Sequence, residues 1–397
     1  TTLTANSTQK LNLNVDMETT FTNAIVKSTS VKELNYDIKQ VGSATSNINL
    51  FVDFASQLEK LKIDNKTDKD IVQTFRDTVS PDTYGSNLKI MDVTTQSKYH
   101  TSSPLRALSK ADFKGVGDNA IVELTGRIGM PTDGRYPLQG TQDITLNAQN
   151  LKTLSVANGE YIMTTRNVSL TSTTDKEGAW VQFGGNIGDG YTKPNNVTVS
   201  AVGQKELLVG HIAAVGDVNL TTKFTQAGSS VILGNPSISI ISNTLTAKNL
   251  TVNHSANTDV VDGIVTLNGH LNLTGNLNVK TSGYKELKLH SGQTISHTIE
   301  EMNIAGSVNI NTVASVAAST TKFGSILGTK GGVKINVSAA NGIADAVFAP
   351  REVVAEQKGI DVTLTNLKTV NFYDDVDTYR GLIANGATDT TKGDINF

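Results

Sequence analysis

The sequence predicts a mainly β protein, built over most of its length as a β-solenoid or as an array of β-sandwiches. The first reason is a strict alternation over residues 265–280, where odd positions are apolar or glycine and even positions are polar. Successive side chains of a strand point to opposite faces, so this period of two indicates strands. Short strands turning at Gly269 and Gly275 would fit a solenoid, and one long curved strand would fit a sandwich.

Internal similarity is the second reason, and it favours the solenoid. Residues 143–156 (DITLNAQNLKTLSV) and 361–372 (DVTLTNLKTVNF) share Asn-Leu-Lys-Thr before an apolar residue, and residues 245–254 form a looser copy. Loose copies of a strand–turn–strand unit are typical of stacked rungs. The spacing between the copies is irregular, so sandwich domains remain the alternative.

The N-terminal region, residues 1–118, is expected to be mixed α/β. Apolar residues over Leu50–Leu61 fall at helical spacing. A second short helix is predicted over Ile71–Val79, because Thr67 and Asp70 ahead of it resemble a capping box. Little helix is expected elsewhere.

Residues 119–397 are predicted to be β-rich. Short alternating runs, such as NNVTVSAVG and GSVNINTVAS, are separated there by clusters of Gly, Asn, Asp or Ser. Regularly spaced strands with turn residues between them are typical of sandwiches, barrels and solenoids.

Composition limits the function classes. The net charge is −3 and charged residues make up 18% of the chain, so we expect no nucleic-acid partner. The chain has no cysteine, which excludes disulfides and a thiol nucleophile. No run approaches the roughly 18 apolar residues of a transmembrane helix, so no membrane-spanning segment is expected.

Two segments, NLKTLSV (residues 150–156) and LTGNLNVKTSG (residues 273–283), resemble the β-rich parts of bacterial surface-layer (S-layer) proteins and large secreted adhesins. The resemblance covers about residues 119–397. It implies a β-solenoid that is secreted, lies at the cell surface and assembles with copies of itself, with cell-surface polysaccharide as a further partner. It also implies calcium as a cofactor that joins subunits.

Four aspartates are the candidate calcium ligands, because calcium requires several oxygen ligands. Asp374, Asp375 and Asp377 cluster in FYDDVDTYR, and Asp189 lies in GGNIGDGYT, which partly resembles a calcium-binding nonapeptide repeat. The first three are also the best candidates for the carboxylate pair of a glycosidase. A solvated acidic turn is the simpler interpretation of that cluster.

No catalytic or cofactor-binding residues are assigned, because no nucleophile, base and orienting group can be assembled from the sequence. The histidines show no zinc-binding spacing. The sequence therefore predicts a non-enzymatic, self-assembling structural protein of a cell surface, forming a homo-oligomer or lattice outside the cell. One alternative is a phage virion component, such as a fibre, tail or capsid-decorating protein. Another is a carbohydrate-active β-helix enzyme.

Overall fold

The protein is described by a computed structural model over most of the chain. The described residues are 2–17, 23–40, 46–53, 55–76, 87–129, 142–234, 244–260, 262–289, 301–314, 319–339, 344–348, 353–355, 360–365, 367–372, 382–383 and 394–396. The chain divides into two compact units, Thr1–Pro194 and Asn195–Phe397. Nearly all of the regular structure is β, as predicted, and the described strand pairings are parallel.

The first unit consists of two parallel sheets between which the chain alternates. In one sheet the order is β2 (Lys10–Met17), β4 (Glu33–Gln40), β6 (Lys60–Asn65), β8 (Ile90–Thr95), β10 (Lys110–Gly115), β13 (Ile144–Gln149) and β16 (Val168–Thr173). In the other the order is β1 (Thr2–Thr4), β3 (Asn23–Lys27), β5 (Ile48–Asp53), β7 (Ile71–Arg76), β9 (Lys98–Thr101), β11 (Ile121–Leu124), β14 (Thr153–Val156) and β17 (Trp180–Ile187). Two short strands, β12 (Ile128–Gly129) and β15 (Tyr161–Met163), pair beside β17.

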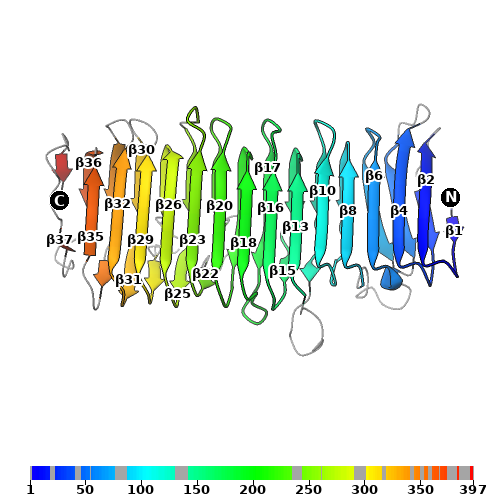
Figure 1. The fold of residues 1–397 in the computed structure, drawn as a ribbon, viewed down its shortest axis with the longest axis horizontal. Coiled ribbons are helices and arrows are strands. Elements are labelled where there is room, and N and C mark those ends of the chain that lie inside the picture. Colours follow the sequence, from blue (N-terminus) through cyan, green and yellow to red (C-terminus); the bar gives the residue numbers. More distant parts are fainter. Residues whose placement is uncertain are drawn as a thin grey trace. The chain divides into compact units, whose positions relative to one another are not determined.

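The second unit adds a third sheet. One sheet contains β18 (Val197–Val202), β20 (Val218–Phe224), β23 (Leu250–Ala256), β26 (Leu277–Tyr284), β29 (Val308–Ala314), β32 (Val333–Ala339), β35 (Ile360–Thr365) and β37 (Leu382–Ile383). Figure 1 shows the strands from β18 to β35 side by side. The second sheet contains β19 (Glu206–Ile212), β21 (Ser230–Leu233), β24 (Ile264–Leu267), β27 (Glu286–Leu289), β30 (Ser319–Phe323), β33 (Ala344–Phe348), β36 (Leu367–Phe372) and β38 (Asp394–Asn396). The third contains β22 (Thr244–Ala247), β25 (His270–Leu273), β28 (Glu301–Ile304), β31 (Ser325–Thr329) and β34 (Val353–Ala355).

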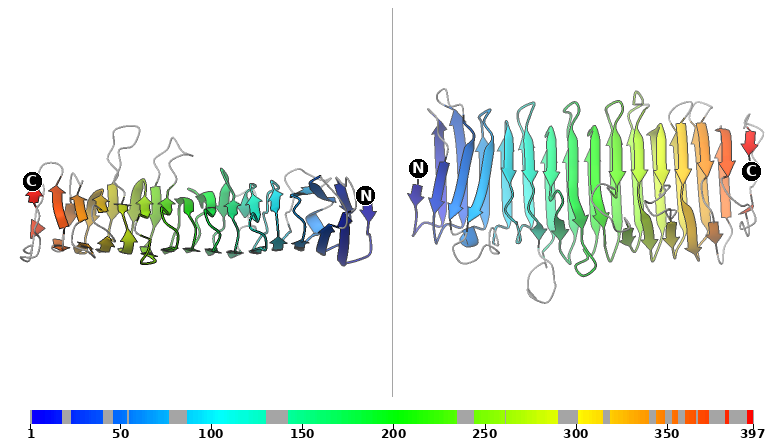
Figure 2. Two further views of the ribbon diagram at one scale, coloured as in Figure 1. Left: turned by 90° about the horizontal axis from the view of Figure 1, so that it is seen from above. Right: turned by 180° about the vertical axis from the view of Figure 1, so that it is seen from behind.

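The alternating stretch of residues 265–280 is one rung of this second unit. It passes through β24, β25 and β26, which belong to three different sheets, and it turns at Gly269, whose φ is 79°. The predicted inward leucines are at most 4% exposed, while the asparagines between them are half-buried or exposed. The solenoid interpretation of this stretch is therefore confirmed. Figure 2 shows, in the green-to-red part of the chain, how successive rungs repeat this path.

Both helices predicted in residues 1–118 were wrong. The first range forms β5, a single 3-10 turn at Ala55–Gln57, and β6. The second range forms β7 over Ile71–Arg76, and residues 77–79 lie outside the described part of the chain. Burial alternates along each strand, so the apparent helical spacing arose from inward residues of separate strands, such as Leu50 and Leu61. The boundary at residues 118/119 stays a prediction.

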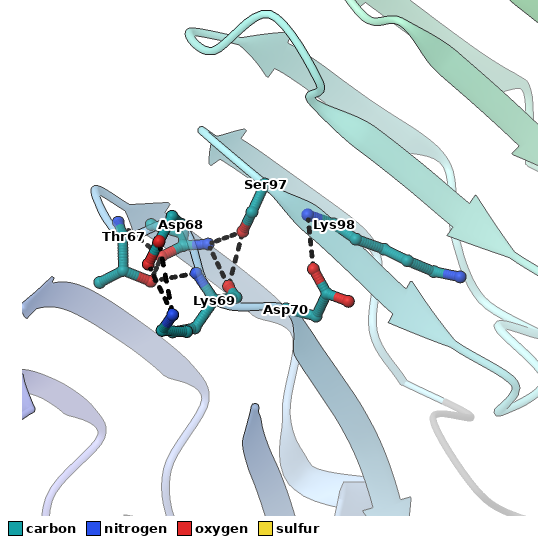
Figure 3. A network of polar contacts seen from close by, with 7 residues as sticks. Thr67, Asp68, Lys69, Asp70, Ser97 and Lys98 are labelled. Carbon is teal, nitrogen blue, oxygen red and sulfur yellow. Dashed lines mark hydrogen bonds and ion pairs between the residues drawn. The ribbon is translucent and has the colours of Figure 1, made fainter. Parts of the chain in front are cut away.

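Hydroxyl groups fix the corners of the first unit. The hydroxyl oxygen of buried Thr67 accepts a hydrogen bond from the backbone N–H of Lys69 at 3.2 Å. The hydroxyl oxygens of Thr95 and Thr101 likewise accept hydrogen bonds from the backbone N–H groups two residues further along the chain. Figure 3 shows one such corner, where Ser97 donates to the backbone carbonyl of Lys69 at 2.6 Å. A side-chain acceptor in a turn satisfies a backbone donor that the sheet no longer pairs, so these corners can be buried.

Candidate functional site

The predicted calcium ligands do not form a described site. Asp374, Asp375 and Asp377 lie outside the described residues. Asp189 closes its own turn, because its Oδ1 accepts the backbone N–H groups of Tyr191 at 2.7 Å and Thr192 at 2.5 Å. Within the described ranges, no group of three His, Cys, Asp or Glu side chains could hold a metal ion. Calcium binding stays a prediction.

The outward face of the long sheet in the second unit, which contains β18 to β35, carries a regular set of polar side chains and is here called the outer polar face. Its side chains are half-buried or exposed, and they alternate along each strand with buried residues, most of which are apolar. They are Thr198, Ser200, Asn219, Thr221, Lys223, Thr251, Asn253, Ser255, Asn278, Lys280, Asn309, Asn311, Lys334, Asn336 and Ser338. Three of these are lysines and the rest are uncharged amides and hydroxyls. Neighbouring strands lie about 4.8 Å apart, so these groups form rows of hydrogen-bond donors and acceptors at that spacing.

A ladder of hydrogen bonds lies at the edge where these strands begin. Asp217 accepts from the amide of Asn249 at 2.7 Å, and its backbone N–H donates to Asn196 at 2.8 Å. The side-chain oxygen of Asn249 accepts the N–H of Asn276 at 2.7 Å, and that of Asn276 accepts the N–H of Ser307 at 2.8 Å. Each residue of this set directly precedes a strand, so the set, here called the asparagine ladder, aligns one rung on the next. Its members are Asn196, Asp217, Asn249, Asn276 and Ser307.

Glycine is required beside this ladder. A Cβ at Gly275 would lie 2.2 Å from Asn249 Oδ1, and one at Gly306 would lie 2.4 Å from Asn276 Oδ1. Real Cβ atoms do not come this close, so these positions need the bare backbone. The recurring pattern of glycine, then Asp, Asn or Ser, then a strand was the sequence signal for the ladder. The ladder is not among the features predicted from the sequence above.

The first unit carries a charged face instead. A shallow hollow of about 270 Å³ is lined by Asn12, Leu13, Asn14, Asn35, Tyr36, Asp37, Lys62 and Asp64. Lys66 contacts Asp37 at 2.7 Å and Asp64 at 3.2 Å, and this hydrogen bond from Lys66 lowers the pKa of Asp37. A glycosidase's general acid needs a raised pKa, so Asp37 lacks the electrostatics of that role. Surface ion pairs of this kind add little stability.

One threonine–histidine pair has the spacing of a nucleophile and its base. Thr222 Oγ1 and His254 Nδ1 lie 2.8 Å apart, and the Phe224 ring meets the imidazole edge-on at 4.3 Å. Both polar side chains are at most 4% exposed, and Nε2 of His254 has no hydrogen-bond partner among the described residues. Among the described residues, no carboxylate forms a hydrogen bond that would orient the imidazole. Burial lowers the pKa of His254 to about 4. The pair therefore belongs to the core of the second unit.

Comparisons with protein-family models, curated proteins and solved structures found no match to this chain. The described sheets define the class of this chain as a parallel β-solenoid protein. In the described part of the chain, no helix has both the length and the apolar character needed to span a membrane.

Proposed function

We propose that the chain is a non-enzymatic, self-assembling structural protein of a cell surface, either a surface-layer subunit or an adhesin-like scaffold. The outer polar face is the observation that carries this proposal. Its amide and hydroxyl rows can hydrogen-bond to matching rows on another copy, since both surfaces have the same spacing. They also offer the donors and acceptors that bind sugar hydroxyls, so cell-surface polysaccharide is the second proposed partner.

Low charge supports association. The net charge of −3 gives weak repulsion between copies at neutral pH. Uncharged amides and hydroxyls cost less to remove from water than ionised groups do, so a face that is mostly uncharged can be covered at modest cost. Calcium would strengthen such an assembly by bridging Asp374, Asp375 and Asp377 to a neighbouring copy, and we place the protein outside the cell.

Light scattering over a range of concentrations tests the proposal. We expect the mean mass to rise with concentration, to rise further with calcium, and to fall when a chelator is added. A protein that stays monomeric at high concentration, with and without calcium, would contradict self-assembly.

A charged variant tests whether the outer polar face is the contact. Asn253 and Asn311 flank Lys280 in register, so Asn253→Lys with Asn311→Lys creates a row of three lysines. Adjacent like charges repel, and we expect this variant to remain smaller than wild type. Thr274→Lys adds a charge at an exposed turn outside the face and should assemble as wild type does.

A further inference from the structure

We infer that the outer polar face binds an acidic polysaccharide along a diagonal row of three lysines. These are Lys223, Lys280 and Lys334, here called the lysine diagonal. The inference rests on the proposed function, because it names the chemical class of the cell-surface polysaccharide that is proposed there as a partner. All three side chains are exposed and belong to the second unit.

The strand register places the three lysines at regular steps. They lie on β20, β26 and β32, which are every second strand in this part of the sheet (Figure 1). Through β23, Lys280 aligns with Thr221, two residues before Lys223. Through β29, Lys334 aligns with Asn278, two residues before Lys280. Each step crosses about 10 Å of sheet and about 7 Å of strand, so the Cα atoms of successive lysines lie about 12 Å apart.

Uncharged polar side chains lie on the strands between the lysines. β23 carries Asn253 and Ser255 there, and β29 carries Asn309 and Asn311. Amide and hydroxyl groups can both donate hydrogen bonds to sugar hydroxyls and accept hydrogen bonds from them. The face therefore alternates a positive charge with a neutral, hydrogen-bonding strand. This pattern fits a chain of sugars that carries an anionic group at regular intervals.

The charge of the lysine diagonal is available to an external anion. The described ion pairs of the second unit join Glu286 to Lys288 and Lys322, and none of them involves the lysine diagonal. Among the described outward residues of this sheet, Asp361 is the one carboxylate; it is half-buried and in register with Lys334. The three ammonium groups thus stand on a surface that is otherwise almost uncharged.

The surroundings of the lysines favour a polysaccharide over a nucleic acid or a membrane. A nucleic-acid strand carries a phosphate about every 3.4 Å, which is much closer than the lysine spacing. Its bases would stack on aromatic side chains, and the outer polar face has none. Peripheral membrane binding adds buried apolar area to charge. The described apolar residues on this side of the sheet, Val202 and Val313, are half-buried and lie on the separate strands β18 and β29.

Binding to polygalacturonate tests the inference, and its fully methyl-esterified form is the neutral probe with the same backbone. We expect dilute protein to bind polygalacturonate in titration calorimetry, and to bind the methyl ester at least about tenfold more weakly, since three exposed charge contacts are lost. Added salt should weaken the binding of polygalacturonate, because it screens exposed charges. Equal affinity for the two polymers would overturn the inference.

Two triple variants with the same change in net charge locate the site. Replacing all three members of the lysine diagonal by glutamine should weaken binding at least about tenfold. The matched control replaces three exposed turn lysines outside the outer polar face and should bind as wild type does. Equal losses in the two variants would overturn the lysine diagonal as the site. The control substitutions are Lys248→Gln, Lys285→Gln and Lys330→Gln.

Two further variants raise the positive charge of the face. Asn253→Lys with Asn311→Lys adds charges beside Lys280, so this variant should bind polygalacturonate more tightly than wild type although it is expected to assemble less. Asp361→Asn removes the carboxylate next to Lys334 and should also tighten binding. Weaker binding by either variant, with the β fold retained in circular dichroism, would overturn the inference.

The outcomes distinguish this inference from the proposed function. Ordered wild-type assemblies, with no binding of polygalacturonate by dilute protein, would overturn the inference and leave self-assembly standing. Binding of polygalacturonate by a protein that stays monomeric would support the inference and contradict self-assembly. Tighter binding to single-stranded DNA or to phosphatidylserine vesicles than to polygalacturonate would overturn the assignment of the partner.

Discussion

Acidification should destabilise the second unit through His254, which lies in β23 between Thr222 and Thr281 of the neighbouring strands. Burial is the cause that lowers its pKa from 6.5 to about 4, since the charged imidazolium would lose its hydration in the core. The unfolded chain therefore binds a proton at a higher pH than the folded chain does. The stabilisation from the neutral imidazole is complete above pH 6.5 and is lost as the pH falls from 6.5 to 4.

The size of the effect follows from that interval. A difference of roughly 2.5 pH units corresponds to about 3 kcal/mol at about 1.4 kcal/mol per unit. We would measure urea unfolding by circular dichroism, and hydrogen exchange of the peptide spanning β23, at pH 7 and pH 4. His254→Gln cannot take up this proton, so it should lose about 3 kcal/mol less than wild type between the two pH values.

A matched variant controls for the general effect of acid. Asn253 lies at an exposed position of the same strand and has no titratable group, so Asn253→Gln should leave the pH dependence close to that of wild type. Parallel pH dependence in wild type and His254→Gln would refute the reasoning, because it would mean that this imidazole is protonated in the folded state at no cost.

Three further predictions concern packing. Leu271 is fully buried and Asn272 beside it faces outward, so Leu271→Ala should lower the free energy of unfolding by about 2–5 kcal/mol, while Asn272→Ala should change it by less than about 0.5 kcal/mol in urea titrations. Gly275→Ala should cost about 1–3 kcal/mol by forcing the asparagine ladder apart, and its control Gly190→Ala, where nothing lies within 4 Å, should be neutral in thermal unfolding. Tyr36→Phe should be neutral or stabilising, because the buried hydroxyl has no hydrogen-bond partner in the described structure; a loss of about 2 kcal/mol on calorimetry would contradict this.

Most of the structure that could be predicted followed from the local alternation of apolar and polar residues. The faces of Leu267, Leu271, Leu273 and Leu277 follow from a period of two, which needs no knowledge of the rest of the chain. The helix predicted over residues 50–61 failed because apolar spacing within one window cannot reveal a turn. There the chain leaves one sheet after β5 and enters the other at β6.

The asparagine ladder could not be predicted from the sequence, because its residues do not recur at a fixed spacing. Its successive contacts join residues 32, 27 and 31 positions apart, because the turns between strands differ in length from rung to rung. The aspartates near residue 375 lie outside the described residues, so their role rests on sequence alone.

Electron microscopy of the purified, negatively stained full chain tests the central claim of self-assembly most directly. The outer polar face and the weak net charge predict ordered arrays, which grow with added calcium and disappear when a chelator is added. Isolated particles of monomer size under all of these conditions would contradict the structural role.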